Sequence, residues 1–290
     1  MRLHKWLVGS LVVLLLLFGY VSWQFGLFAQ PHKAAPLVTP EASSEAENQP
    51  DRINILLLGI DSRVPGGPGR SDIMLLLSVD LVNQQAALLS IPRDTRVEIP
   101  GRGLDKINHA HAFGGVQLAM QTVANAFQVP IHHWIRIDMT AMTELVDRFG
   151  PVTVQVPLAL TLRDGTQVGP GPVPMDGRLA MLYLRERYSD PIGDVGRSER
   201  AQGFLMDLAR HLMREVGPAE IPRLYTILRN YADTDIRLQD GFWQRVLQIH
   251  PDSVQRGTVR GRGIMIDDIY YYEVDWEQTE EVLRSLGLRR

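Results

Sequence analysis

Acidic and basic side chains recur next to apolar segments of this sequence, where the ends of secondary-structure elements would hold them. Asp61 follows the apolar run 53–60, and Arg70 and Asp72 come after a short loop rich in proline and glycine. Carboxylates supply the hard oxygen ligands that Mg²⁺ prefers, and arginine binds anions such as phosphate. This pattern indicates a divalent cation and an anionic substrate. Capping or turning of the chain is the alternative role for Asp61 and Asp72.

Arginines gather again in the middle of the chain. Arg185, Arg187, Arg197 and Arg200 lie on the two sides of a glycine- and proline-containing loop at residues 188–196, which carries Asp190 and Asp194; Arg93 follows another apolar run. Arginine side chains bind phosphate oxygens with two parallel hydrogen bonds. A helix that begins at Ser198 would add backbone N–H donors to the same anion site. A single arginine such as Arg185 could instead stabilise a helix C-terminus, but the combination favours an anion site.

Several common catalytic motifs are absent from the sequence. It contains no Walker-type phosphate loop, no dinucleotide-binding glycine motif, no HExxH motif and no GxSxG nucleophile elbow. It has no cysteine, which excludes disulfides, thiolate nucleophiles and cysteine-ligated metals. The net charge of −3 gives no reason to expect a nucleic-acid partner.

The elements that must position these residues alternate between strands and helices. Strands are expected at residues 53–60, 73–79, 85–91, 133–137, 152–156, 257–264 and 269–274. Helices are expected at residues 106–113, 116–127, 139–149, 176–187, 198–216, 221–231, 240–249 and 276–286, with Asp176 and Asp275 as N-caps. A loop or small hairpin is expected at 161–174. Since some strands are joined by short turns, the sequence predicts an α/β fold with a mixed central β-sheet covered by helices on both faces.

The N-terminal segment is typical of a membrane anchor. Residues 6–29 carry no charged side chain, and a helix needs roughly 20 apolar residues to span a bilayer. Arg2 and Lys5 precede this run, which favours an N-terminus that stays inside. We therefore expect a cytoplasmic segment at 1–5, a transmembrane signal anchor at 6–29, a linker rich in proline and glutamate at 30–51, and an extracytoplasmic domain at 52–290. A cleaved signal peptide is the alternative, but the apolar run is long for one.

The order of the motifs resembles the LytR-CpsA-Psr (LCP) family of cell-wall glycopolymer ligases over residues 53–212. The resemblance is carried by NILLLGIDSR at 54–63, RSD at 70–72, SIPRDT at 90–95, KIN at 106–108, DG at 176–177, RER at 185–187 and DVGR at 194–197, followed by Arg200 and Gln202. One departure is Ala201, where the family usually has glutamine. The loss of that side chain predicts that a contact to the head group or the lipid phosphate is weaker or is made by another residue.

The resemblance implies an enzyme that moves a glycopolymer from a polyprenyl-pyrophosphate carrier to a sugar hydroxyl of peptidoglycan and releases polyprenyl phosphate. It implies that Mg²⁺ binds at Asp61 and Asp72, and that Arg93 acts with them in catalysis. The arginines implied around the pyrophosphate are Arg70, Arg93, Arg185, Arg187 and Arg197, and the further pocket residues are Lys106, Asp194 and Gln202. The lipid tail would lie in an apolar tunnel of the domain.

The sequence is also compatible with two other functions. The same residues would serve a pyrophosphatase that uses water in place of the sugar hydroxyl. A non-catalytic, membrane-anchored regulatory or binding protein is the second alternative. Asp61, Asp72 and Asp94 all remain candidates for the general base, although an acid that holds the metal is a poor base.

Overall fold

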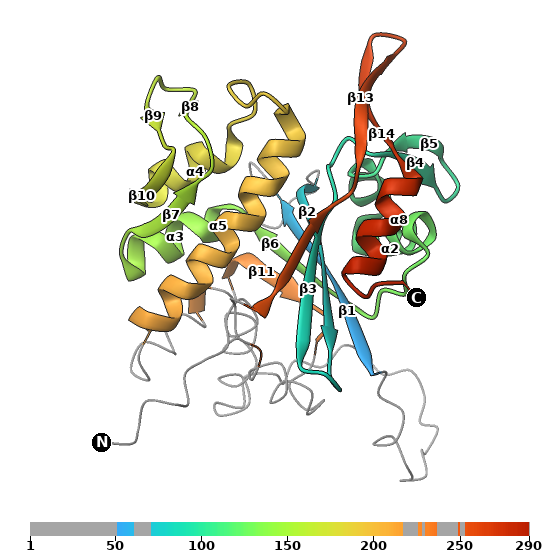
Figure 1. Cartoon of the computed structure of the whole chain (residues 1–290), viewed down its shortest axis with the longest axis horizontal. Helices are drawn as coiled ribbons and strands as arrows, with labels where there is room; N and C mark the ends of the chain where they lie inside the picture. The colour runs from blue at the N-terminus through green and yellow to red at the C-terminus, as the bar shows by residue number, and fades with distance from the viewer. Residues whose placement is uncertain are drawn as a thin grey trace, which may run out of the picture.

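A mixed six-stranded β-sheet forms the centre of the molecule (Figure 1). The computed structural model describes residues 51–60, 71–216, 226–227, 230–236, 249 and 253–289. In spatial order the strands are β11 (Ala232–Thr234), β6 (His133–Asp138), β1 (Arg52–Ile60), β2 (Ser71–Asp80), β3 (Gln85–Ser90) and β12 (Gln255–Thr258). The β1–β6 and β3–β12 pairs are parallel, and the other three pairs are antiparallel. The predicted mixed sheet is confirmed, and a short turn joins the antiparallel strands β2 and β3.

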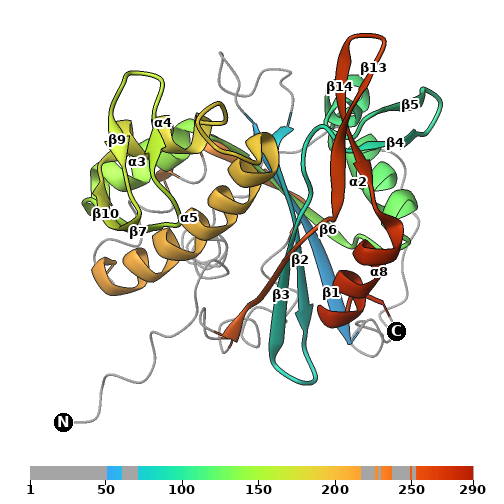
Figure 2. The same cartoon turned by 45° about the horizontal axis from the view of Figure 1, so that its top comes forward.

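Alternate residues of β1 point into two apolar cores, one on each face of the sheet. Leu56, Leu58 and Ile60 pack in a core that also contains residues of α2 (His109–Phe127) and α8 (Trp276–Ser285). Ile53, Ile55 and Leu57 pack in a second core with residues of α5 (Gly193–Glu215). A strand buried on both faces reads as a continuous apolar run, which is why its position could be predicted. Helices on both faces of the sheet are therefore confirmed, and the two views in Figures 1 and 2 agree on this arrangement.

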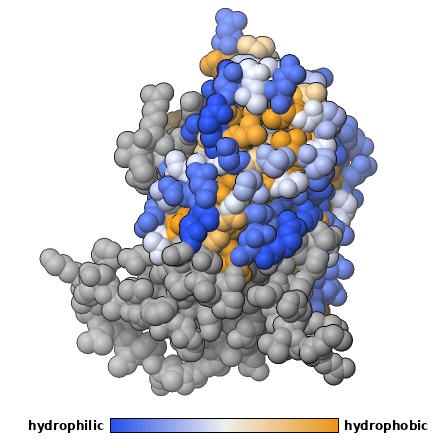
Figure 3. Space-filling view, turned by 90° about the vertical axis from the view of Figure 1, so that its left-hand side faces the viewer, coloured by the Kyte–Doolittle hydropathy of each residue, from blue (hydrophilic) through white to orange (hydrophobic). Residues whose placement is uncertain are grey.

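A smaller layer packs beside α5 around a third core. It contains α3 (Thr140–Phe149), β7 (Val152–Val156), β8 (Leu160–Thr161), β9 (Gln167–Val168), β10 (Gly171–Met175) and α4 (Gly177–Arg185). Strands β7 and β10 pair antiparallel, and β8 and β9 form the small hairpin expected within residues 161–174. This side of the molecule presents hydrophilic residues around small apolar patches (Figure 3).

The region between β3 and α2 differs from its prediction. Strands β4 (Arg96–Ile99) and β5 (Gly103–Lys106) form an antiparallel hairpin that the sequence pattern did not indicate. Gly101 and Gly103 have φ values of +74° and +79°, which glycine adopts at little cost and which allow the tight turn. As a result Lys106 ends a strand, whereas a helix was expected to start there. The predicted break at residues 114–115 is confirmed, because both glycines leave helical geometry within α2.

Helix α5 begins at Gly193, five residues before the predicted start at Ser198. The sequence preference for loop at residues 193–197 is overridden by tertiary contact, since Gly196 lies directly against the Asp190 carboxylate. A Cβ atom on Gly196 would come within 2.1 Å of an Asp190 oxygen, so only glycine lets the helix start there. Helix α4 also ends two residues early, at Arg185, and Asp176 caps its start as predicted, accepting the Leu179 N–H at 2.7 Å.

The C-terminal part follows its prediction with one correction. The strand expected at 257–264 is two strands, because β12 joins the central sheet and β13 (Gly261–Ile266) turns away to pair with β14 (Ile269–Val274). The strand expected at 269–274 is confirmed as β14. Asp275 caps α8 by accepting the Gln278 N–H at 3.0 Å, also as predicted.

Several predicted features lie outside the described residues. These are the anchor at 6–29, the linker at 30–50, the site residues Asp61 and Arg70, and most of the helices expected at 221–231 and 240–249. Within the part of the chain that the structure describes, no helix has the length and apolar character needed to cross a membrane.

Candidate active site

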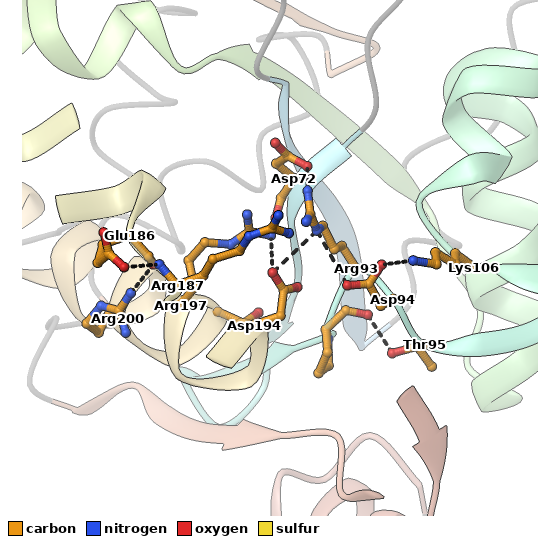
Figure 4. A network of polar contacts seen from close by, with 12 residues as sticks. Asp72, Arg93, Asp94, Thr95, Lys106, Glu186, Arg187, Asp194, Arg197 and Arg200 are labelled. Carbon is orange, nitrogen blue, oxygen red and sulfur yellow. Dashed lines mark hydrogen bonds and ion pairs between the residues drawn. The ribbon is translucent and has the colours of Figure 1, made fainter. Parts of the chain in front are cut away.

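Residues from three separate segments meet at one edge of the central sheet (Figure 4). Asp72 is the second residue of β2, Arg93 follows the end of β3, and Asp194 and Arg197 lie in the first two turns of α5. The hydroxyl groups of Ser90 in β3 and Ser198 in α5 are 2.7 Å apart in the interior, which fixes the start of the helix against the strand. The fold therefore brings together residues that are up to 125 positions apart in the chain.

Arg93 is the centre of this cluster. Its Nη1 atom lies 2.5 Å from Asp72 Oδ1, and its Nε atom lies 3.4 Å from Asp194 Oδ1 and 3.7 Å from Asp94 Oδ2. Burial alone would lower the pKa of Arg93, but the carboxylates of Asp194, Asp72 and Asp94 outweigh it and raise the pKa above its ordinary value. Arg93 is therefore a permanent positive charge held in a fixed position.

Arg197 and Asp194 form a buried ion pair next to Arg93. Arg197 Nη2 lies 2.9 Å from Asp194 Oδ1 and donates a hydrogen bond to the backbone carbonyl of Asp72 at 3.0 Å. Burial raises the pKa of Asp194 and lowers the pKa of Arg197, in each case despite the attraction of the partner. The contacts of Asp194 Oδ1 with Arg93 and Arg197 are ion pairs without hydrogen-bond geometry, and among the described residues neither Asp194 oxygen accepts a hydrogen bond. Burial therefore outweighs the attraction within this ion pair, and both pKa values move toward the neutral forms.

Lys106 closes the opposite side of the cluster. Its Nζ atom lies 2.8 Å from Asp94 Oδ1, and Figure 4 shows it on the far side of Arg93 from Arg187 and Arg200. The backbone of Asp94 is held in turn by β14, because its carbonyl oxygen accepts the Tyr272 N–H at 2.8 Å. The segment after β3 is therefore fixed from both sides.

A second network holds Arg187, and sequence reasoning missed it. Glu186 Oε1 accepts the backbone N–H groups of Arg187 at 2.9 Å, Tyr188 at 2.6 Å and Ser189 at 3.0 Å. Arg200 binds the Asp190 carboxylate and donates to the Glu186 carbonyl oxygen. In the sequence, this network is indicated only by the position of Glu186 between Arg185 and Arg187. An acidic residue between two arginines is equally typical of a charged surface exposed to solvent.

Replacing Glu186 with alanine is expected to lower the free energy of unfolding by about 1.5–3 kcal/mol, because three backbone N–H groups lose a charged acceptor. Burial raises the pKa of Glu186, but the three N–H groups outweigh it and hold the pKa below its usual value of 4.5. The contribution is therefore complete above pH 4.5 and is lost as the pH falls through the lowered pKa. Denaturant unfolding between pH 3 and 7 measures the difference from the unsubstituted protein. A difference that is the same at all pH values would contradict the assignment.

The remaining predicted site residues within the described part of the chain are Arg185 and Gln202. Arg185 ends α4 and is half-buried. Gln202 is buried, and its Nε2 atom donates to the carbonyl oxygens of Leu88 at 2.8 Å and Gly257 at 3.3 Å. These bonds join β3 to β12, so the contacts of Gln202 indicate a structural role, and its predicted binding role remains a prediction. Ala201 is buried in the apolar core of the smaller layer rather than in the arginine–aspartate cluster.

Asp72 fits the predicted Mg²⁺ site as one ligand. Arg93 contacts its Oδ1 atom, while Figure 4 shows the other oxygen facing away from Arg93. Residues that the structure describes contain no group of three or more histidine or acidic side chains that could hold a metal by themselves. Mg²⁺ is commonly bound by one or two carboxylates together with substrate phosphates and water, which is compatible with this donor set. Ile60, which precedes the predicted second ligand Asp61, pairs with Ser71 beside Asp72.

Comparisons with known proteins agree with one another. The sequence model of the LytR_cpsA_psr family matches residues 29–287. The chain is 33% identical over 257 residues to the polyisoprenyl-teichoic acid–peptidoglycan teichoic acid transferase TagU of Enterococcus faecalis, covering 86% of this chain and 84% of that protein. The crystal structure of B. subtilis TagU superposes with a TM-score of 0.64 and 28% identity, covering 83% of this chain and 98% of that one. A structure of TagT bound to LI-WTA gives a TM-score of 0.66 and 27% identity, with coverages of 82% and 91%.

Proposed function

Because the chain belongs to the LytR-CpsA-Psr family, we propose that it transfers a glycopolymer from a polyprenyl-pyrophosphate carrier to a sugar hydroxyl of peptidoglycan and releases polyprenyl phosphate. The relatives are named as transferases that join teichoic acid to peptidoglycan, which supports this class of reaction. The observation that carries the proposal is the cluster around Arg93, where fixed cations and carboxylates converge at one edge of the sheet.

The side chains of the cluster supply what a phosphoryl transfer requires. Arg93 and Arg197 neutralise the pyrophosphate, and Arg187 adds a third cation from the segment that follows α4. The acceptor hydroxyl oxygen forms a bond to the phosphorus that carries the glycan, and the bond from that phosphorus to the bridging oxygen breaks. The lipid leaves as its phosphate. The hydroxyl proton passes to a carboxylate. Asp94, which pairs with Lys106, is the candidate because it is not one of the proposed metal ligands.

The proposal includes Mg²⁺ held by Asp72 together with Asp61. When bound, the ion adds positive charge next to the pyrophosphate oxygens and so favours departure of the lipid phosphate. Asp72 contributes a carboxylate whose orientation is fixed by Arg93.

Removal of divalent cations by EDTA is expected to abolish transfer, and Mg²⁺ is expected to restore it. In the Asp72→Asn variant the Mg²⁺ concentration for half-maximal rate should rise by about 10- to 100-fold, because a neutral amide replaces a charged ligand. Asp164→Asn is the matched control, since Asp164 pairs with Arg178 at the surface of the smaller layer. An unaltered Mg²⁺ dependence in Asp72→Asn would remove Asp72 from the proposed metal site.

We also propose that residues 6–29 anchor the protein in the cell membrane, with residues 52–290 outside the cytoplasm. The uncharged apolar run and the preceding Arg2 and Lys5 support this topology. It places the domain where both the lipid carrier and peptidoglycan are accessible. Protease treatment of intact spheroplasts should degrade the domain, and its protection would contradict the topology.

The reaction is tested with purified protein, a polyprenyl-pyrophosphate-linked glycan and peptidoglycan. Chromatography should show polyprenyl phosphate and glycan attached to peptidoglycan only when both substrates are present. Rapid release of free glycan phosphate without peptidoglycan would instead identify a pyrophosphatase. Absence of turnover under both conditions would favour a binding or regulatory protein.

A further inference from the structure

A groove with a cavity volume of about 610 Å³ lies between the β4–β5 hairpin, the end of α2 and the junction of β14 with α8. The side chains that line it include Arg96, Glu98, Asn125 and Trp276. The volume is within the range of small-molecule sites in proteins. The groove is separate from the Arg93 cluster, and the mechanism proposed above does not use it.

The lining combines an open aromatic ring with charged and amide groups. Trp276 is 50% exposed, and its ring centroid lies 5.8 Å from the ring of the buried Phe127. The indole is therefore supported by the core while much of it faces solvent. Glu98 and Asn125 are exposed at the groove and offer hydrogen bonds to hydroxyl or acetamido groups. A flat ring flanked by such groups suits a glycan, which has apolar C–H faces and polar edges. An apolar lipid tail would leave the charged groups desolvated without partners.

A continuous row of side chains joins the groove to the Arg93 cluster. Lys106, whose Nζ atom contacts Asp94, lies 5.6 Å from the centroid of the Tyr271 ring. The guanidinium of Arg96 lies 5.8 Å from the same ring, and Arg96 lines the groove. Arg96 and Lys106 are direct partners in the β4–β5 pair, so both side chains face the same way. The groove thus begins beside the residues that would meet the acceptor.

We propose that this groove binds the glycan strand of the peptidoglycan acceptor, with Trp276 as the stacking platform and the Lys106 end directed to the reacting hydroxyl. This inference rests on the proposed transfer reaction. The row from Lys106 through Tyr271 to Arg96 orients the glycan strand of the acceptor. One sugar of this glycan strand reaches the Arg93 cluster, while neighbouring sugars occupy the groove.

The test measures the two substrates separately, with soluble uncross-linked peptidoglycan strands as the acceptor probe. Trp276→Ala is expected to raise KM for the strands by about tenfold, while KM for the lipid-linked donor and kcat remain unchanged. Trp276→Phe should recover most of the loss. Phe113→Ala is the matched control, because Phe113 is a 43% exposed aromatic residue of α2 that does not line the groove. Thermal unfolding establishes that each variant is folded.

A second substitution keeps the test independent of the folding of the Trp276 variant. Asn125→Ala removes an exposed amide from the groove and should raise KM for the strands about threefold, as expected for the loss of one hydrogen bond. If the unsubstituted protein transfers glycan but folded Trp276→Ala and Asn125→Ala have unchanged KM for the strands, the inference is wrong while the reaction stands. An increase in KM for the donor alone would assign the groove to the lipid-linked substrate and overturn the inference. If the unsubstituted protein does not transfer glycan at all, the proposed function itself fails.

Discussion

Replacing Arg93 with alanine is expected to lower kcat/KM for glycopolymer transfer by about 10²- to 10³-fold, the usual effect of losing one fixed donor to a developing charge. The reason is the position of Arg93, whose guanidinium contacts Asp72 and also lies near Asp94 and Asp194. The variant would lose a cation next to the pyrophosphate. It would also leave three carboxylates without that cation, and these would repel an anionic substrate.

The measurement is a steady-state rate of polyprenyl phosphate release at saturating peptidoglycan. Arg93→Lys should recover only part of the rate, because an ammonium group cannot reproduce the planar contacts of a guanidinium. Arg102→Ala is the matched control, since Arg102 is an exposed arginine that lies over the Phe113 ring, 4.9 Å from its centroid, outside the cluster. Near-normal transfer by folded Arg93→Ala would exclude Arg93 from the reaction.

Sequence patterns predicted the parts of the site that depend on the ends of buried elements. Asp72 and Arg93 adjoin strands whose apolar runs are unmistakable, and strands that pair in one sheet bring their ends to a common edge. For Asp194 and Arg197 the motif alone indicated proximity to the other arginines, and the structure places both beside Arg93. The core strands of the fold were predictable because they, too, are apolar runs.

The remaining features depend on contacts between distant segments, which local patterns do not encode. The start of α5 depends on the close approach of Gly196 to Asp190, and the helix preference of residues 193–197 is too weak to show it. The β4–β5 hairpin depends on two glycines with positive φ rather than on a long apolar run. Gln202 shows another such contact, because its side chain bonds the backbones of β3 and β12, while its predicted binding role stays a prediction.

The Arg200→Ala substitution is expected to have the largest effect on stability, lowering the free energy of unfolding by about 3–5 kcal/mol. Arg200 and Asp190 form an ion pair in which each side chain is only 1% exposed. Their attraction offsets the cost of burial only while both charges are present. Removal of the guanidinium leaves the Asp190 carboxylate buried without its cation, although it still accepts the Ile192 N–H at 3.0 Å.

Chemical denaturation of matched variants distinguishes this pair from a surface ion pair. Arg178→Ala breaks the Arg178–Asp164 pair, in which Arg178 is 69% exposed, and should change stability by less than about 1 kcal/mol. The double variant Arg200→Met/Asp190→Asn removes both charges and should recover part of the loss, since no uncompensated charge remains. If Arg200→Ala were no more destabilising than Arg178→Ala, the buried pair would contribute no more to the free energy of unfolding than a surface ion pair.

The Arg200→Ala substitution should also affect the reaction, through its effect on Arg187. Arg200 donates to the carbonyl oxygen of Glu186, whose carboxylate fixes the backbone of Arg187. A folded Arg200→Ala variant should therefore bind the lipid-linked donor more weakly, even though the Arg200 guanidinium is itself bound to Asp190 and to the Glu186 carbonyl oxygen. A raised donor KM in Arg200→Ala, absent from Arg178→Ala, would show that the buried network positions the binding arginine as well as stabilising the fold.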